Sequence, residues 1–309
     1  MIPVLDLAAW KNGDRAGFSH DLGAACRGPG FFLLRNAAIP AAIRAEAFAQ
    51  ARAFFALNDE EKQALSIARS PHNRGYAALG AETLDPTSGQ MDRKEAFNIG
   101  LGLAADDPQV IAGAPFRGVN LWPNLPGFRS ALLAYFQAAA ALNATLHQAV
   151  ARDLGQAEDF FAPHFSAPIS TLRLLRYPVA TDESGQIGAG EHTDYGNLTL
   201  LATDGVPGLQ VRPRGGHDWV DVPHVAGTLI VNIGDLLMRW TNGIYASTPH
   251  RVLPPPAERF SLAFFADPNP DSVVAALPGT GDPRQPPIKA ADYLTQRLNA
   301  TYDTRDTSA

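Results

Sequence analysis

The stretch that decides the fold is residues 191–201, which read Glu-His-Thr-Asp-Tyr-Gly-Asn-Leu-Thr-Leu-Leu. It places His192 and Asp194 two positions apart, just before an apolar run typical of a strand. Side chains at i and i+2 of a strand project to the same face, so we expect both to point into a barrel. Residues 247–252, Ser-Thr-Pro-His-Arg-Val, add a second imidazole, His250. Two imidazoles and one carboxylate suit iron(II), and zinc, manganese or cobalt accept the same ligands.

Segments with strand-like composition surround this stretch at short, fairly regular intervals. They cover residues 170–177, 198–202, 209–212, 219–222, 228–233, 250–253 and 260–265. Turn signals such as Pro207-Gly208 and Asn242-Gly243 separate them. Many short strands with this spacing, without a βαβ pattern, predict a mainly β fold with a jelly-roll (double-stranded β-helix) core.

The first half of the chain reads mostly as helices. Apolar residues at helical intervals predict one helix over residues 39–57 and a longer one that begins after Gly127 and ends near Gly155, with a short helix near residues 58–65. Residues 2–7 predict a short strand, and residues 70–124 predict loops with brief strands.

We therefore expect a single domain over residues 1–309 in three parts. A mostly helical N-terminal region covers 1–160, and a jelly-roll core with the metal site covers 166–267. A C-terminal extension, 268–309, carries a helix from about residue 291 to 302.

Composition excludes several classes of protein. The 309 residues are 46% hydrophobic and 18% charged, as in an ordinary globular protein. A net charge of -6, without a basic run, argues against nucleic-acid or anionic-membrane partners. The single Cys26 allows no internal disulfide, and neither a signal peptide nor a membrane span is recognisable. We expect a cytoplasmic protein that is a monomer or a weak homo-oligomer.

Arg259 and Ser261 are candidates for binding a carboxylate. The planar fork of an arginine makes two parallel hydrogen bonds to a carboxylate, and a hydroxyl two residues further along a strand faces the same way. The alternative is a surface arginine on an edge strand.

The wider segments resemble the isopenicillin N synthase-like family of iron(II)/2-oxoglutarate-dependent oxygenases. The resemblance rests on residues 191–201, on Asn232-Ile233-Gly234-Asp235, on residues 241–252 and on Arg259-Phe260-Ser261. The opening residues 2–7 and 30–32, together with 74–76 and 92–97, also look like this family. The resemblance runs from residue 2 to about residue 267.

This resemblance implies a double-stranded β-helix with His192, Asp194 and His250 as iron ligands, and with 2-oxoglutarate and O2 as co-reactants. It also implies that the Tyr177 phenol helps to hold 2-oxoglutarate. Many plant members carry Asn-Tyr-Tyr-Pro where this chain has Leu-Arg-Tyr-Pro at 175–178. Isopenicillin N synthase keeps an Arg-x-Ser but uses no 2-oxoglutarate, so the motif alone leaves the cosubstrate open.

Residues that flank the motifs are candidates to contact a small-molecule substrate. They are Arg74, Tyr76, Phe97, Tyr195, Asn197, Phe265 and Asp267. For each of them, core packing or a local ion pair is an equal alternative. Asp235 is expected to shape a turn, and Lys94-Glu95 to form a structural salt bridge.

Three functions fit these observations. The first is a 2-oxoglutarate-dependent dioxygenase that hydroxylates a C–H bond of a small organic molecule and yields succinate and CO2. The second is an oxidase, cyclase or desaturase of the same fold that works without 2-oxoglutarate. The third is a zinc-dependent hydrolase or a non-catalytic metal-binding barrel. The chain has no H-E-x-x-H motif, which argues against the hydrolase.

Overall fold

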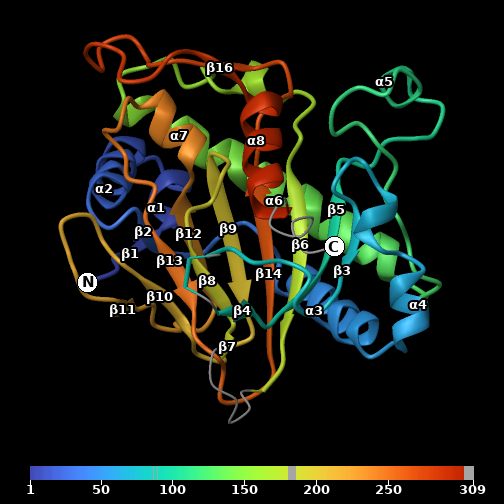
Figure 1. The fold of residues 1–309 in the computed structure, drawn as a ribbon. Helices are drawn as coiled ribbons and strands as arrows, with labels where there is room; N and C mark the ends of the chain where they lie inside the picture. The colour runs from blue at the N-terminus through green and yellow to red at the C-terminus, as the bar shows by residue number, and fades with distance from the viewer. Residues whose placement is uncertain (86, 89, 180–185, 303–309) are drawn as a thin grey trace.

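Two β-sheets that face each other form the centre of the protein (Figure 1). The computed structural model describes residues 1–85, 87–88, 90–179 and 186–302. The strands of the large sheet are, in order across it, β1 (Val4–Asp6), β2 (Phe31–Arg35), β12 (Leu229–Ile233), β9 (Leu198–Thr203), β14 (Arg259–Ala266), β6 (Thr171–Tyr177), β5 (Glu95–Gly100) and β3 (Gly75–Ala77). The strands of the small sheet are β11 (Val220–Asp221), β10 (Leu209–Val211), β13 (His250–Val252) and β8 (Ala189–His192). Within these two sheets, neighbouring strands of the described residues are antiparallel except β1 and β2.

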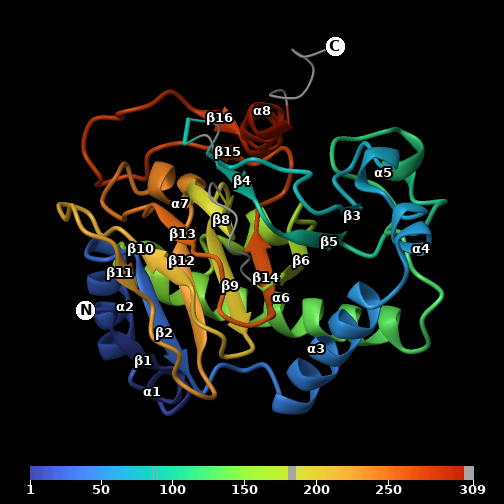
Figure 2. The same ribbon diagram turned by 60° about the horizontal axis from the view of Figure 1, so that its bottom comes forward.

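Helices cover the outer face of the large sheet (Figure 2). They are α1 (Leu7–Lys11), α2 (Arg15–Arg27), α3 (Ala41–Phe55) and α6 (Phe128–Asp153). The remaining helices are α4 (Asp59–Gln63), η1 (Ile67–Arg69), α5 (Pro108–Ile111), η2 (Ala162–Phe165), α7 (Asp235–Trp240) and α8 (Ala290–Tyr302). Two small ribbons complete the fold: β4 (Met91–Asp92) with β7 (Gln186–Ile187), and β15 (Val273–Val274) with β16 (Ile288–Lys289).

Strand β14 shows how alternation separates the two faces of the large sheet. Phe260, Leu262 and Phe264 are buried in the core that the helices cover. Arg259 and Ser261 lie on the opposite face, toward the small sheet. Because successive side chains of a strand point to opposite faces, one strand contributes both to packing and to the site.

The helix predictions from the sequence are confirmed, with local chemistry that explains where the helices begin. Helix α3 begins after Pro40, whose fixed φ suits a helix start. Asn58 caps α4 in a capping box with Glu61. Helix α6 follows Gly127, whose φ of 81° is in the left-handed region that favours glycine.

The N-terminal region carries the helices that the sequence predicts, and it also supplies half of the strands of the large sheet. Strands β1, β2, β3 and β5 all lie before residue 166, where we expect the β core to begin. Helix α2 was not expected either; Asp14 caps it and its Phe18 and Leu22 pack in the core. In the described part of the chain, no helix has the length and apolar character that crossing a membrane requires.

Candidate metal centre

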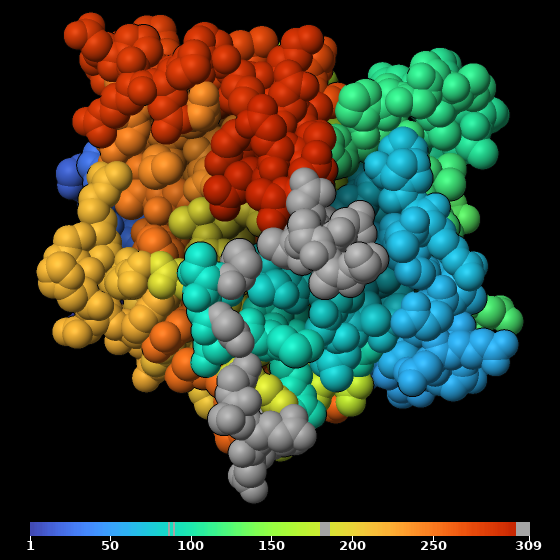
Figure 3. Space-filling model, in the orientation of Figure 1, coloured from blue at the N-terminus to red at the C-terminus, as the bar shows by residue number. Residues whose placement is uncertain are grey.

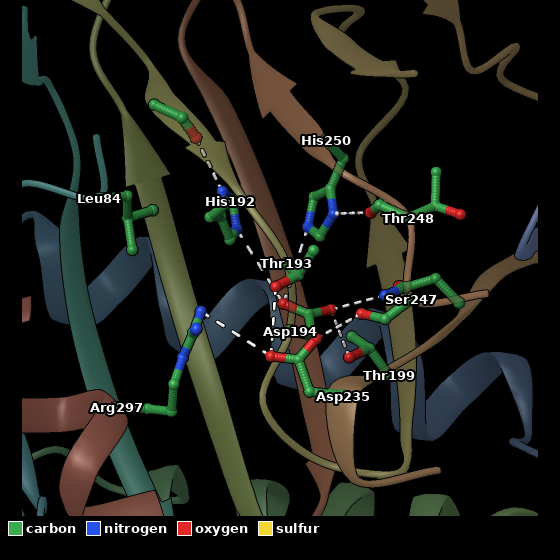
Figure 4. A network of polar contacts seen from close by, with 12 residues as sticks. Leu84, His192, Thr193, Asp194, Thr199, Asp235, Ser247, Thr248, His250 and Arg297 are labelled. Atoms are coloured by element: carbon green, nitrogen blue, oxygen red, sulfur yellow. Dashed lines mark hydrogen bonds and ion pairs between the residues drawn. The ribbon is translucent and has the colours of Figure 1, made fainter. Parts of the chain in front are cut away.

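His192, Asp194 and His250 converge in the structure (Figure 4). One ligand atom from each residue lies within 4.8 Å of the others. His250 Nε2 is 3.6 Å from Asp194 Oδ1, and His192 Nε2 is 4.0 Å from the same oxygen. The two histidines are register partners on the antiparallel strands β13 and β8. This pairing brings together ligands that are far apart in the sequence.

Backbone carbonyls orient both imidazoles. His192 Nδ1 lies 2.7 Å from the Gly190 carbonyl oxygen, and His250 Nδ1 lies 3.1 Å from that of Thr248. A carbonyl only accepts, so each Nδ1 carries the proton and each Nε2 keeps its lone pair. Burial, followed by the charge of His250, lowers the pKa of His192. A neutral imidazole with Nε2 directed at Asp194 is the form that binds a metal ion.

Asp194 is held as a carboxylate by its own hydrogen bonds. The Thr199 hydroxyl and the Asn232 amide both donate to Oδ2, at 2.5 and 2.6 Å, which leaves Oδ1 toward the histidines. Burial alone would raise the pKa of Asp194, but the two imidazoles and these hydrogen bonds lower it.

The spacing of His192 and Asp194 predicts that both lie in one strand and point to the same face. The structure differs from this prediction. Strand β8 ends at His192, and Asp194 lies in the segment that follows. There the backbone N–H of Asp235 donates to the Asp194 carbonyl oxygen at 2.8 Å. The segment is therefore held against the start of α7 rather than in a sheet.

The metal residues line a cavity of about 160 Å³ between the two sheets. Apolar side chains such as Leu175, Ala263 and Val252 form much of its wall. They come from both sheets, so the cavity lies between the two layers of the β structure.

Arg259 lines the same cavity and is only 1% exposed. Its Nε donates to the Val206 carbonyl oxygen at 3.2 Å, and its guanidinium lies 4.8 Å from the centre of the Tyr177 ring. Ser261 Oγ is 3.5 Å from Arg259 Nη1. No carboxylate of the described residues pairs with Arg259. A buried cation without an acidic partner is costly, and an anionic ligand relieves that cost.

The seven expected substrate contacts fall into two groups. Tyr195, Phe265 and Asp267 line the cavity. Burial, followed by the charge of Asp194, raises the pKa of Asp267 to about 7, and no described donor reaches its carboxyl group.

The other four residues make contacts with protein instead. Arg74 is buried against Gly100, and Tyr76 donates to Glu95 at 2.6 Å. Phe97 packs in the core, and the Asn197 side-chain amide lies 3.1 Å from His147 Nε2.

Lys94 and Glu95 do not pair with each other. They lie next to each other and face opposite ways, so Lys94 contacts Asp92 and Glu82, whereas Glu95 contacts Lys62 and Arg176.

The structure adds cavity residues that the sequence did not indicate as substrate contacts. They are Asn73, Asn98, Thr171, Arg173, Leu294 and Leu298. Asn73 has a φ of 59°, which asparagine tolerates better than most residues. Alternation from Phe97 could have indicated Asn98, but nothing local indicates that residues of the C-terminal helix reach this cavity.

The fold and the site indicate the class of enzyme to which the protein belongs. A 2-His-1-carboxylate site beside a buried arginine that pairs with no described acid is the arrangement of a non-haem iron oxygenase that uses a carboxylate cosubstrate. The geometry fits both groups, because three ligand atoms lie within 4.8 Å of one another and Arg259 lacks an acidic partner among the described residues.

Comparison with known proteins gives the same answer. Residues 2–125 match the model of the non-haem dioxygenase in morphine synthesis N-terminal domain, and residues 168–268 match that of the 2OG-Fe(II) oxygenase superfamily. The 2-oxoglutarate-Fe(II) type oxidoreductase hxnY of Emericella nidulans is 34% identical over 97% of this chain and 90% of its own.

Two solved structures are similar over nearly the whole chain. A full-length Neurospora crassa protein, solved in complex with alpha-KG and thymine, has a TM-score of 0.85 and 32% identity, covering 97% of this chain and 96% of its own. A putative 2OG-Fe(II) oxygenase family protein from Caulobacter crescentus has a TM-score of 0.85 and 30% identity, covering 97% and 98%. The chain belongs to the 2OG-Fe(II) oxygenase superfamily, within the isopenicillin N synthase-like family.

Membership decides among the three functions considered from the sequence. The protein is a 2-oxoglutarate-dependent iron(II) dioxygenase that acts on a small organic molecule. Iron(II) and 2-oxoglutarate are its cofactor and cosubstrate.

Proposed function

We propose that this dioxygenase hydroxylates a C–H bond of its substrate and that each site residue has a defined role. His192, Asp194 and His250 hold iron(II), while Arg259 binds the distal carboxylate of 2-oxoglutarate with help from Ser261 and Tyr177. The observation that carries these roles is that Arg259, without an acidic partner among the described residues, lies in the cavity that also contains the three convergent ligand atoms.

We propose further that the two facing sheets form a double-stranded β-helix within a single domain. Their strands are antiparallel across the site, and the cavity lies between them.

When bound, iron(II) would activate O2: one oxygen atom would enter succinate as 2-oxoglutarate is oxidatively decarboxylated with release of CO2, and the other would enter the C–H bond of the substrate. The residues of this chain orient the reactants and exclude water. Thr199 and Asn232 keep one oxygen of Asp194 occupied, so that the other faces the metal position. Arg259 and Ser261 fix one end of the cosubstrate, and apolar residues such as Ala263 keep the centre dry.

We propose that the substrate is a small planar molecule with N–H donors, such as a pyrimidine base. The Asn98 side-chain oxygen is buried without a partner, and no described donor reaches the Asp267 carboxyl group. Both groups satisfy their hydrogen-bonding capacity when a ligand donates to them. Phe265 and Tyr195 supply ring faces beside them. The similar Neurospora crassa protein has been solved with thymine and with 5-formyluracil, which supports this class.

A titration without oxygen tests the proposed function. Iron(II) and then 2-oxoglutarate are added to the full-length protein, and the visible charge-transfer band of the chelate is followed. We expect the band, and on admission of oxygen we expect succinate, formed faster with thymine than without it. No band and no succinate would refute the cosubstrate assignment, whereas succinate that thymine does not stimulate would refute only the substrate class.

A further inference from the structure

Asp235 joins three segments of the active site, although its sequence context suggests only a turn. It is the first residue of α7, and it is 7% exposed. Figure 4 shows hydroxyl groups and a guanidinium converging on its carboxylate. None of the residues that contact this carboxylate is a metal ligand.

The first two contacts come from segments that carry the metal ligands. Thr193, between two of the ligands, donates its hydroxyl to Asp235 Oδ2 at 3.2 Å. Ser247, three residues before His250, donates to Oδ1 at 2.6 Å.

Backbone hydrogen bonds strengthen the contact between the start of α7 and the metal-ligand segment. The N–H groups of Gly234, Asp235 and Leu236 donate to carbonyl oxygens of residues 194–197.

The third contact comes from the C-terminal helix α8. Tyr293 donates its phenol to Asp235 Oδ2 at 2.8 Å, and Arg297 Nη2 lies 3.8 Å from the same oxygen. The Arg297 guanidinium lies 4.5 Å from the centre of the Tyr195 ring. On the same helix, Leu294 and Leu298 line the cavity. Figure 3 shows α8, in red, on the surface beside the blue-green residues of the N-terminal half.

The Oδ2 atom of Asp235 therefore accepts hydrogen bonds from two hydroxyl groups: that of Thr193, in the metal-ligand segment, and that of Tyr293, on α8. We propose that Asp235 is a positioning residue through which the docking of α8 holds the metal-ligand segment in place. A displacement of α8, whose Leu294 and Leu298 line the cavity, would then also displace the segment that carries the metal ligands. The inference rests on the proposed function only for the identity of the metal, because the coupling itself is a property of the folded chain.

A simpler role for Asp235 is to stabilise α7 as an acid in its first turn. The two roles predict different effects of a substitution on α8 on the metal-ligand segment. Tyr293→Phe leaves Asp235 and α7 intact and removes only the hydroxyl from the α8 side. A helix-stabilising role predicts no effect of this variant on the metal-ligand segment, whereas coupling predicts one.

Amide hydrogen exchange of the full-length, metal-free protein is the decisive measurement. In Tyr293→Phe, loss of a hydrogen bond to a charged acceptor should speed exchange in α8 by about tenfold. Coupling also requires faster exchange, by roughly threefold or more, at Gly234, Asp235 and Leu236, whose amides donate to the metal-ligand segment. The affinity for iron(II), measured anaerobically by competition with a chelator, should fall by roughly threefold or more.

Tyr245→Phe is the matched control. Its phenol also donates to a buried carboxylate, that of Asp153, at 2.6 Å, but this contact lies away from the cavity. It should leave the exchange of residues 234–236 and the affinity for iron(II) unchanged. If Tyr293→Phe behaves like this control, or changes α8 alone, the coupling does not exist.

The reverse change covers the case in which Tyr293→Phe does not fold. Thr193→Val removes the hydroxyl from the metal-ligand side, and reciprocity requires that it speed exchange in α8. Unchanged exchange of α8 in this variant would overturn the proposal. Neither measurement depends on turnover, so failure of the proposed reaction would be seen separately.

Discussion

Replacing Arg259 by methionine should greatly weaken the binding of 2-oxoglutarate without lowering the unfolding free energy of the protein that has no ligand bound. Methionine fills much of the same volume but has no charge and no hydrogen-bond donor. The Arg259 side chain is buried and pairs with no described acid, so its removal relieves a desolvation cost. The bound cosubstrate, in contrast, would lose the only cation that we assign to its distal carboxylate.

The size of the effect follows from that burial. A hydrogen bond to a charged group contributes about 1.5–3 kcal/mol, and truncating one partner of a buried charge pair costs about 2–5 kcal/mol. The Kd for 2-oxoglutarate should therefore rise by about 30-fold to several thousand-fold. Arg259→Lys keeps the charge but loses the planar fork, so its Kd should fall between those of the wild type and the methionine variant.

Anaerobic titration of the iron(II)-loaded protein with 2-oxoglutarate, followed at the charge-transfer band, measures these constants. Thermal unfolding gives a second readout. At a ligand concentration about 100 times the wild-type Kd, the wild type gains about 2.7 kcal/mol and a variant with 100-fold weaker binding gains only about 0.4 kcal/mol. Arg176→Met is the control, because Arg176 pairs with Glu95 and Glu258 away from the cavity.

Two results would refute this reasoning. One is a Kd of Arg259→Met within about fivefold of the wild type, which is less than the loss of one charged hydrogen bond. The other is an equal loss of 2-oxoglutarate affinity in Arg176→Met, which would indicate a general effect of removing charge.

Three further predictions concern the metal site and the core. Thr199→Val removes the hydroxyl that donates to Asp194, so the affinity for iron(II) in an anaerobic chelator competition should fall by about tenfold or more; an unchanged affinity would contradict the role of this hydrogen bond. Burial lowers the pKa of His147 to about 4, below its ordinary value of 6.5, so the stability that its neutral form contributes is present above pH 6.5 and lost as the pH falls toward 4. When the pH falls from 7 to 5, the unfolding free energy of the metal-free wild type, measured with urea, should therefore decrease by about 2 kcal/mol more than that of His147→Gln. Equal decreases would rule out a neutral, buried His147. Phe97→Ala should cost about 3–5 kcal/mol of unfolding free energy, because Phe97 packs between Phe54 and Phe128, yet its Kd for 2-oxoglutarate should match the wild type; a clear change in that Kd would place it in the site.

The metal ligands could be predicted from the sequence because each lies in a short segment with its own signature. His192 and Asp194 are two positions apart, and His250 follows a proline in a second recognisable segment. Their meeting depends on the pairing of β8 with β13, which no local pattern encodes. The same limit applies to the large sheet, because β1 and β3 have three residues each, too few for alternation to show.

The substrate side could not be predicted because its residues share no local pattern. Asn98 comes from β5, Asp267 from the position directly after β14, and Leu294 from α8. Arg74 shows the opposite case, in which a motif residue is not among those that line the cavity. A Cβ at Gly100 would lie 1.8 Å from Arg74 Nη2, so the arginine occupies space that only a glycine leaves.

The order of strands in the large sheet has a consequence for the protein while it is being synthesised. Phe32, Leu33 and Leu34 of β2 are all 0% exposed in the finished fold, and β2 pairs with β12 on one side. Residues 229–232 leave the ribosome roughly 200 residues after β2, which at typical rates of synthesis is about 10–40 s later. During that time β2 has only β1 beside it, and an apolar strand edge invites pairing with other chains. Nascent chains of this enzyme should therefore depend on chaperones until β12 emerges, and mutations that slow the closing of this sheet should lower the yield of protein before they alter the finished enzyme.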